Sequence, residues 1–381
     1  MTSESGKTIV IAVGMFDSVH FAKWLELFRD EPIDFLLFPS SPNRSIHAQL
    51  RTLVDRQSTA TYRYAFNLAA VLSLPLWLID RIAQDRLRGY LLRRLIKRHG
   101  PNFVHALGIQ SAGYILLSAL GKSDERGRPK IIVTNYGSDI FWFARFEKHK
   151  AKIRRLLEMA DTYACECQRD VSLAQSLGFR GRIMPVHPNA GGFSKAELEH
   201  PLSELPARST IAVKGYQGWV GRAALAIEAL ELIHSQVSHF EIEIYSCNAI
   251  TVRLARKLSR RTGLKVIAHR KHALTHTEVL EMFRRSIVYV GISESDGIST
   301  SLLEAMACGA IPVQTSTACC DEWFTETGVR VETISPQEIA KSILLALRIA
   351  ENPENRGVNW RTISKRASQA RIQASALQYY Q

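Results

Sequence analysis

Short apolar runs alternate with helix-forming segments along most of this 381-residue chain, and this alternation constrains the fold more than any other feature. Strands buried on both faces appear as short apolar runs, and parallel pairing needs a long crossover between them. The sequence therefore predicts an α/β protein built on doubly wound parallel sheets. The expected strands are residues 8–13, 35–38, 103–106, 130–134 and 161–164, then 210–213, 240–245, 264–268, 287–290 and 310–314.

The alternation is interrupted between residues 184 and 209, where the chain carries four prolines and a Gly-Gly pair. A chain of this length is also too long for one ordinary core. We therefore expect a first Rossmann-like domain over residues 1–190, a linker over 191–209 and a second domain over 210–358. The remaining residues, 359–381, have a helical pattern and are expected to cross back to the first domain.

The chain is strongly basic, with 49 Lys and Arg against 36 Asp and Glu and a formal charge of +13. This balance suits an anionic partner, and no nucleic-acid-binding signature accompanies it. No apolar stretch reaches the length of about 18 residues that a membrane span needs, and no signal peptide is recognised. The six cysteines have no paired spacing. We therefore expect a cytoplasmic protein with reduced thiols and no metal site.

Residues 287–312, IVYVGISESDGISTSLLEAMACGAIP, predict a strand, an acidic loop and the start of a helix. Free N–H groups at such a helix start bind phosphate. Glu304, about one turn inside the helix, is placed to reach a ribose, and Asp296 lies where an attached sugar would project. A capped helix beside a solvated acidic loop is the alternative. The candidates in this segment are Asp296, Gly297, Ser299, Thr300, Ser301 and Glu304.

Residues 211–222, IAVKGYQGWVGR, follow the first strand of the second domain. Their glycines are spaced GxxGxxG rather than GxGxxG, so hydride chemistry has little support. Small residues let a backbone approach a phosphate, while Lys214 and Arg222 supply positive charge. A Gly-rich turn with solvated basic residues is the alternative. The candidates are Lys214, Gly215, Gly218 and Arg222, with Arg270 a further candidate near a nucleotide base.

Asp296 and Glu304 enclose seven residues, and Glu304 lies in the run LLEAMACGAIPV. This order resembles the E-x7-E signature of retaining glycosyltransferases, in particular glycosyltransferase family 4. Asp296 stands where the family usually has its first Glu, since Glu294 is spaced two residues too far. Residues 211–222 resemble a variant of the family's G-R-x5-K segment, which neutralises the donor pyrophosphate.

The resemblance implies the GT-B architecture, with two Rossmann-like domains facing a central cleft. It also implies metal-independent, retaining transfer of a sugar from a nucleotide diphosphate-sugar, with UDP or GDP expected and no cofactor. The acceptor would be a hydroxyl of a glycan or lipid-linked glycan, in cell-envelope polysaccharide or glycoconjugate synthesis. Two alternatives stay open: a nucleotide-sugar 2-epimerase of the same fold, and a non-catalytic binding or scaffold protein.

Three segments of the first domain resemble family segments at strand ends. They are GMFDSVHFAKW after the first strand, FVHALG, and NYGSDI, which resembles H-G-x-D. In FVHALG, Leu107 replaces the second His of the family's HxH. The resemblance implies that these segments bind acceptor, with Gly14 near the donor and Asp139 joining Asp296, Lys214 and Arg222 in catalysis. The candidates are Gly14, Asp17, His20, His105, Tyr136, Gly137, Ser138 and Asp139, and Asn189, Gly191 and Gly192 resemble the family's P-N-G hinge.

Residues 62–99 lie outside the resemblance and combine leucines at helical spacing with a run of basic residues from Arg81 to His99. One interpretation is an amphipathic helix, over residues 81–99, that lies on an anionic membrane surface. The protein would then be peripheral at the inner face of the membrane. The alternative is an ordinary surface helix whose leucine face packs on the sheet.

Overall fold

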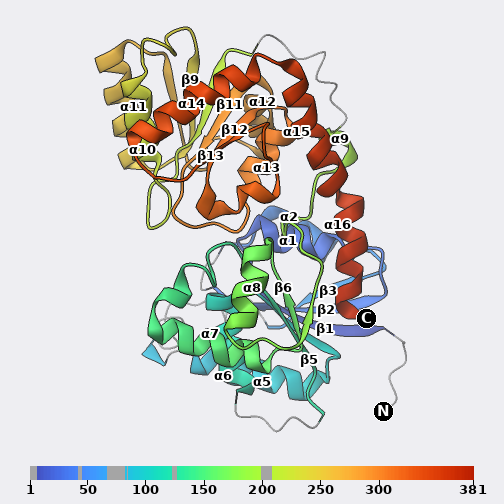
Figure 1. Cartoon of the computed structure of the whole chain (residues 1–381). Helices are drawn as coiled ribbons and strands as arrows, with labels where there is room; N and C mark the ends of the chain where they lie inside the picture. Colours follow the sequence, from blue (N-terminus) through green and yellow to red (C-terminus); the bar gives the residue numbers. More distant parts are fainter. Residues whose placement is uncertain (1–6, 42–44, 67–81, 84, 122–126, 199–207) are drawn as a thin grey trace. The chain divides into compact units, whose positions relative to one another are not determined.

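The computed structural model describes residues 7–41, 45–66, 82–83, 85–121, 127–198 and 208–381 (Figure 1). The chain divides into two compact units. The first comprises Met1–Gly192 and Gln369–Gln381, and the second comprises Phe193–Ser368. Each unit is built around one parallel sheet, so the predicted α/β class is confirmed. Residues 199–207 of the predicted linker lie outside the described residues.

The sheet of the first unit has seven strands in the order β3-β2-β1-β4-β5-β6-β7. Their bounds are β1 Thr8–Gly14, β2 Ile33–Pro39, β3 Thr61–Tyr64, β4 Phe103–Leu107, β5 Lys130–Thr134, β6 Thr162–Ala164 and β7 Arg182–Ile183. Side chains of β1 enter two cores in alternation: Ile11 and Val13 on one face, Val10 and Ala12 on the other. Burial on both faces explains why this strand is a continuous apolar run.

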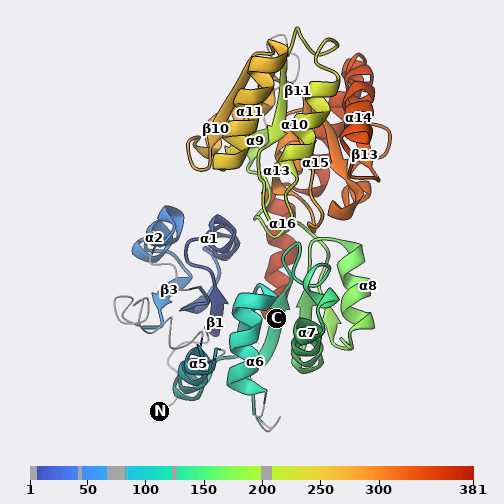
Figure 2. The ribbon, with the colours of Figure 1, turned by 90° about the vertical axis from the view of Figure 1, so that its left-hand side faces the viewer.

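Helices cover both faces of the first sheet (Figure 2). One face packs against α5 Arg86–His99, α6 Tyr114–Leu120, α7 Glu147–Met159 and α8 Gln168–Ser176. The other packs against α1 Val19–Glu26, α2 Ala48–Asp55 and the C-terminal helix α16 Gln369–Ala376. In α5 the buried residues include Leu92, Leu95 and Ile96, which lie on one helical stripe.

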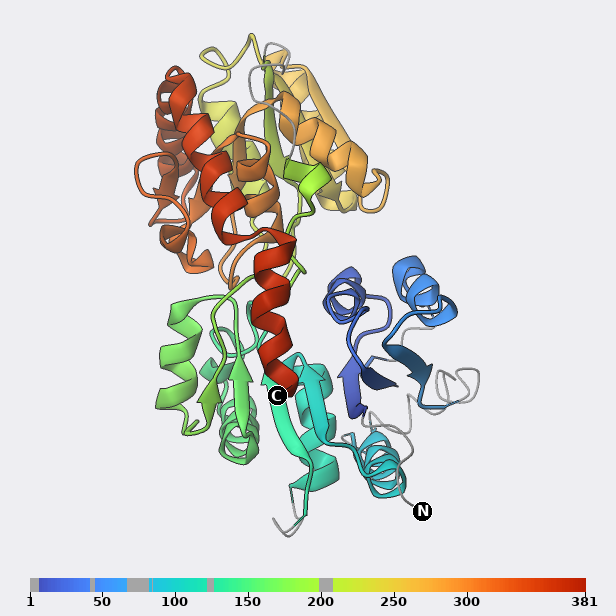
Figure 3. The same cartoon turned by 90° about the vertical axis from the view of Figure 1, so that its right-hand side faces the viewer.

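The second unit repeats this plan of one sheet with helices on both faces (Figure 3). Its six strands have the order β10-β9-β8-β11-β12-β13. Their bounds are β8 Thr210–Lys214, β9 Glu241–Cys247, β10 Val266–Arg270, β11 Ser286–Gly291, β12 Ile311–Thr315 and β13 Val329–Val331. One face packs against α10 Ala223–Leu232, α11 Ala249–Thr262 and α14 Pro336–Ala350. The other packs against α9 Lys195–Leu198, α12 His276–Arg285, α13 Thr300–Ala307 and α15 Pro353–Arg366.

The helical tail predicted over residues 359–381 is two helices rather than one. The first, α15, begins earlier, at Pro353, after an Asn352 side chain that accepts from the backbone N–H of Glu354. The second, α16, is part of the first unit. There Gln373 Nε2 donates to the carbonyl of Leu27 at 2.9 Å. The chain therefore ends within the unit in which it begins.

Within the basic segment over residues 81–99, residues 86–99 form α5, a surface helix of the first unit. Leu92, Leu95 and Ile96 are buried against the sheet and α6, as expected of an ordinary surface helix, and contact of this helix with a membrane stays a prediction. Tyr90 is exposed on this helix, and most of the other exposed side chains are basic. These basic side chains are Arg86, Arg93, Arg94, Lys97 and Arg98. Arg81 lies outside the described residues, and no helix that the structure describes is long and apolar enough to span a membrane.

In each sheet the strand order reverses direction beside the first strand of the unit. The reversal lies between β1 and β4 in the first sheet and between β8 and β11 in the second. Open parallel sheets bind ligands at the carboxyl ends of the strands at such a point. Lys214 is the last residue of β8 and Gly291 the last of β11, so both motifs of the second unit start there.

Candidate functional site

Two loops leave the carboxyl edge of the second sheet side by side, one after β8 and one after β11. Backbone hydrogen bonds join them: the N–H of Arg222 donates to the carbonyl of Ile292 at 3.0 Å, and that of Glu294 to Val220 at 2.9 Å. The Gly-rich loop and the acidic loop are therefore fixed to each other. Two motifs that are about 80 residues apart in sequence form one site at the switch point.

Lys214 connects the two motifs through its side chain. Its Nζ donates to the Ser299 hydroxyl at 3.0 Å and lies 3.7 Å from Asp296 Oδ2. Burial alone would lower the pKa of Lys214, but its interactions with Tyr289, Asp296 and Glu304 outweigh burial and raise that pKa. Lys214 is therefore a fixed positive charge at the carboxyl edge of the sheet.

The start of α13 lies beside this charge. Ser299 precedes the helix in an extended conformation, and its carbonyl accepts from the backbone N–H groups of Leu302 and Leu303. Its hydroxyl does not cap the helix, because it accepts from Lys214 instead. The partial positive charge of the helix start, at Thr300 and Ser301, thus adds to the lysine charge. Together they suit a phosphate group.

The side chain of Asp296 is held within its own loop. Its Oδ1 accepts from the backbone N–H of Gly297 at 3.0 Å, while Oδ2 faces Lys214. The backbone N–H of Asp296 donates to the Thr317 carbonyl at 3.4 Å. These contacts place Asp296 and Gly297 within the site. A direct contact between Asp296 and a sugar stays a prediction.

Glu304 lies inside the site and is nearly buried, with 9% of its side chain exposed. Its Oε1 lies 2.9 Å from Nε2 of His276, the first residue of α12. The sequence analysis did not identify His276. A signal for its position exists, because Thr275 and Glu278 form a capping box that marks the start of α12. The contact between His276 and Glu304 forms only when the two helices pack together, so the local sequence does not reveal it.

Arg222 lies on the same loop as Lys214 but has different partners. Its guanidinium pairs with Glu294 at 2.8 Å and donates to the carbonyls of Gly218 and Gly221. Glu294, which the motif spacing set aside, therefore anchors the two loops to each other through Arg222. In the structure Arg222 helps to hold the two loops together. A contact between Arg222 and a diphosphate stays a prediction.

Two positions of the Gly-rich loop require glycine because neighbouring backbone atoms pack closely against them. A Cβ at Gly215 would lie 2.6 Å from the carbonyl oxygen of Tyr245, and one at Gly221 would lie 2.2 Å from that of Tyr216. A Cβ at Gly218 would meet the Tyr216 side chain at 3.3 Å. Close packing within the unit thus explains Gly215, and an approach to phosphate is not needed to account for it.

Two further candidates lie apart from this group. Arg270 ends the edge strand β10, which β9 separates from β8 in the sheet. Gly14 ends β1 and belongs to the first unit. A Cβ at Gly14 would lie 2.4 Å from the Phe21 ring, so packing of α1 on β1 accounts for this glycine. The contacts that join Lys214 to the start of α13 therefore involve neither Arg270 nor Gly14.

Several acceptor-side candidates come together at the carboxyl edge of the first sheet. Asp17 accepts from the Ser41 hydroxyl at 3.3 Å, and His20 lies in the first turn of α1, which directly follows β1. The rings of His20 and Tyr136 have centroids 6.5 Å apart. Gly137 and Ser138 follow Tyr136, and Gly137 has a φ of +32°, in the region that favours glycine.

Asp139 is anchored in the same region by backbone N–H groups. Its Oδ2 accepts from Ile109 at 2.8 Å and from Tyr136 at 3.2 Å. Burial raises the pKa of this carboxyl to about 7, although the two backbone hydrogen bonds oppose the shift and Asp170 adds to it. An Asp that titrates near neutrality has the acid–base capacity expected of a catalytic group. Its role stays a prediction.

His105 is not at the surface of this site. It is wholly buried in β4, where Nδ1 lies 2.8 Å from the Tyr380 hydroxyl and Nε2 lies 2.7 Å from the Thr134 hydroxyl. Burial lowers its pKa to about 3, so the ring is neutral. The expectation that His105 contacts an acceptor is therefore corrected: both ring nitrogens are used to join β4, β5 and the C-terminal segment.

The hinge-like segment near residue 190 is held by polar contacts within the first unit. The backbone N–H of Asn189 donates to Glu166 at 2.9 Å, and its side chain donates to the Asn135 carbonyl at 3.2 Å. Gly191 and Gly192 have φ values of +81° and +75°. Glycine adopts this left-handed conformation without strain, so both positions require it.

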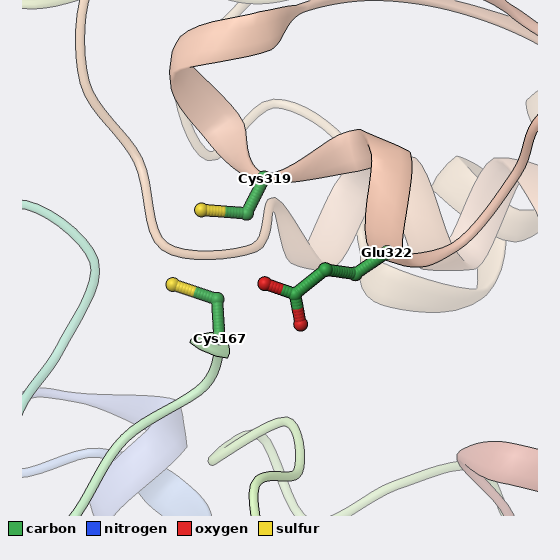
Figure 4. A group of neighbouring side chains, drawn as sticks. All are labelled: Cys167, Cys319 and Glu322. Atoms are coloured by element: carbon green, nitrogen blue, oxygen red, sulfur yellow. The ribbon is translucent and has the colours of Figure 1, made fainter. Parts of the chain in front are cut away.

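All six cysteines are free and buried. Figure 4 shows Cys319 and Glu322, which lie three residues apart in the second unit, and Cys167, which belongs to the first. Burial raises the pKa of the Cys308 and Cys320 thiols to about 12, which makes both unreactive.

Residues 211–348 match the family described as "Glycosyl transferases group 1". The match runs from β8 into α14 and includes Lys214, Asp296 and Glu304. A search of curated proteins found no match. The family match therefore covers the segment in which the two loop motifs meet.

Solved structures match nearly the whole chain. OtsA, in an apo structure, is 12% identical over 99% of both chains with a TM-score of 0.71. Sucrose-phosphate synthase from Thermosynechococcus elongatus is 14% identical over 98% of both, with a TM-score of 0.65. Anabaena HepE, in complex with UDP-glucose, is 11% identical over 97% of this chain and 98% of its own, with a TM-score of 0.67. Likeness at such identities shows the fold, and that fold is GT-B.

Proposed function

We propose that this chain is a glycosyltransferase of group 1 that transfers a sugar from a nucleotide diphosphate-sugar to a hydroxyl acceptor, a proposal supported by the family match of residues 211–348 and by the GT-B fold. Transfer would retain the anomeric configuration and need no metal ion. The observation that carries the proposal is the contact of Lys214 with Ser299 and Asp296 at the start of α13. This arrangement provides fixed positive charge where a diphosphate would lie.

The reaction needs stabilisation of the leaving group more than it needs a nucleophile. As the bond between sugar and phosphate breaks, negative charge grows on the departing diphosphate. The Lys214 ammonium and the helix start are held in place before the reaction, so they stabilise this charge with little reorganisation. The acceptor hydroxyl would attack from the face that the phosphate leaves and give its proton to a phosphate oxygen. Retention follows from attack on that face.

The donor proposal is tested by a thermal-shift screen and a hydrolysis assay with UDP-, GDP- and ADP-sugars. We expect one nucleotide class to raise the Tm, and the released or transferred sugar to keep the donor's anomeric configuration in NMR spectra. Activity should persist in EDTA. No turnover and no Tm shift with any donor would contradict the proposal, and conversion of the donor to its epimer without acceptor would indicate a 2-epimerase.

Glu304→Ala is expected to weaken donor binding by roughly 100-fold, because a buried carboxylate makes charge-assisted hydrogen bonds to the ribose hydroxyls. The measurement is the Kd of the nucleoside diphosphate by calorimetry. Glu281→Ala, which removes an exposed carboxylate from α12, is the matched control and should bind as the unmodified chain does. A Glu304→Ala chain that folds and keeps its donor affinity would refute the ribose role.

The acceptor is proposed to be a glycan or lipid-linked glycan. The outward face of α5 supports this, since its exposed arginines and lysine would be attracted to anionic lipid. With the leucine stripe buried, attraction would be electrostatic and sensitive to salt. Peripheral association at the inner face of a membrane is proposed on this basis.

A further inference from the structure

A cavity of about 450 Å³ lies in the first unit at the edge of the sheet where β4 and β5 begin. Its walls come from the last two turns of α5, from residues 100–102 before β4 and from residues 127–130 at the start of β5. In Figures 1 and 2, α5 lies beside α6 on this unit. The cavity is at the amino ends of the strands, opposite the edge at which such sheets bind their substrates.

Four cationic side chains line this cavity: Arg93, Lys97, Arg128 and Lys130. Asp161 binds the guanidinium of Arg128 through both oxygens, at 2.6 and 2.9 Å. Across the part of the chain that the structure describes, no carboxylate lies within ion-pair distance of the other three. The cavity therefore carries about three uncompensated positive charges, which repel one another at close range.

Local structure accounts for some of these cations but not for the group. Lys97 lies in the last turn of α5, where a cation stabilises the helix dipole. Lys130 lies over the Phe103 ring, with its Nζ 5.5 Å from the centroid. Neither effect explains why Arg93 and Arg128 line the same cavity. An anionic ligand would compensate the three charges that have no carboxylate partner.

We propose that this cavity binds the phosphate group of an anionic ligand. Phosphate oxygens match both the planar fork of arginine and the point charge of lysine. Asp161 holds Arg128 in one orientation and so reduces the ordering that binding requires. The volume lies in the range of small-molecule sites and admits a phosphorylated small molecule or a lipid headgroup. This site is independent of the proposed sugar transfer.

The test compares two double variants of α5 in the full chain. Arg93→Gln/Lys97→Gln removes two charges that line the cavity. Arg94→Gln/Arg98→Gln removes the same charge from neighbouring exposed positions of the same helix that do not line it. The ligands are inorganic phosphate and glycerol 3-phosphate, measured by calorimetry, and phosphatidylglycerol vesicles against phosphatidylcholine vesicles, measured by co-sedimentation.

For the soluble phosphate probes we expect the cavity variant to lose about tenfold or more in affinity and the control variant to lose less than about threefold. In the vesicle arm both variants lose general attraction to anionic lipid, so a headgroup site requires the cavity variant to lose at least about threefold more than the control. Loss confined to soluble phosphates identifies a small-molecule site, and loss confined to phosphatidylglycerol vesicles identifies a lipid headgroup site. Equal loss in both variants would overturn the proposal, because it would show general surface charge. Absence of phosphate binding by the unmodified chain in every arm would also overturn it.

Discussion

Replacing Lys214 with glutamine is expected to lower kcat/KM for sugar transfer by roughly 100- to 1,000-fold, the usual effect of removing one fixed group that stabilises a developing oxyanion. The ammonium is oriented by Ser299 and Asp296. It keeps its charge because Tyr289, Asp296 and Glu304 raise its pKa. Since negative charge on the diphosphate grows as the bond breaks, the loss should fall mainly on kcat.

The measurement is steady-state kinetics with the donor identified by the nucleotide screen, together with the Tm of each variant. Lys257→Gln, which removes an exposed lysine from α11, is the matched control and should leave kcat/KM within about twofold. A Lys214→Gln chain with an unchanged Tm and kcat/KM within tenfold of the unmodified protein would contradict the role. A loss confined to KM would mean that Lys214 binds donor without stabilising the transition state.

The interior strands were predictable because burial on both faces leaves a continuous apolar run. β1, β4 and β8 are examples, and each lies in the middle of its sheet. The sequence analysis missed β3, β7 and β13, and each of these is an edge strand. In β3 the sequence TYRY includes the exposed Arg63, and β7 has only two residues. These three strands depend on pairing with a neighbour more than on their own pattern, whereas the edge strand β10 was predicted from its apolar run.

The residues of the proposed donor site divide in a similar way. The lysine that ends β8 and the start of α13 can be recognised locally, because a strand, a loop and a helix follow one another in the sequence. Their position at a switch point follows from the strand order. The pairing of Glu304 with His276 joins two helices and has no local signal. Arg222 was recognised as a cation, but its partner Glu294 lies 72 residues away. Contacts between residues so far apart in the sequence form only once the sheet has folded.

His105 shows how a motif can mislead when a distant segment covers it. Its position at a strand end indicated a surface role. In the structure, Tyr380, which is 275 residues away, lies at hydrogen-bond distance from Nδ1, and Trp24 packs edge-on at a centroid distance of 5.8 Å. The C-terminal segment therefore converts a strand-end histidine into a core residue. This burial has a consequence for stability in acid.

Acidification below about pH 6.5 is expected to destabilise the first unit through His105. The pKa of this imidazole is lowered by burial to about 3, whereas in the unfolded chain it returns to about 6.5. Between these values the unfolded state binds a proton that the folded state does not. The contribution is therefore complete above pH 6.5 and is lost as the pH falls, at about 1.4 kcal/mol per pH unit.

His105→Gln removes this titration while keeping a side chain that can hydrogen-bond Thr134 or Tyr380. We expect the variant to be less stable than the unmodified chain at pH 7, yet to lose less free energy of unfolding between pH 7 and pH 4, by roughly 3 kcal/mol. Urea unfolding at both pH values, followed by tryptophan fluorescence, measures the difference, because the Trp24 ring lies against His105. His234→Gln, at an exposed position of the second unit, is the control. Equal acid sensitivity of the His105→Gln and unmodified chains would show that the buried imidazole does not resist protonation.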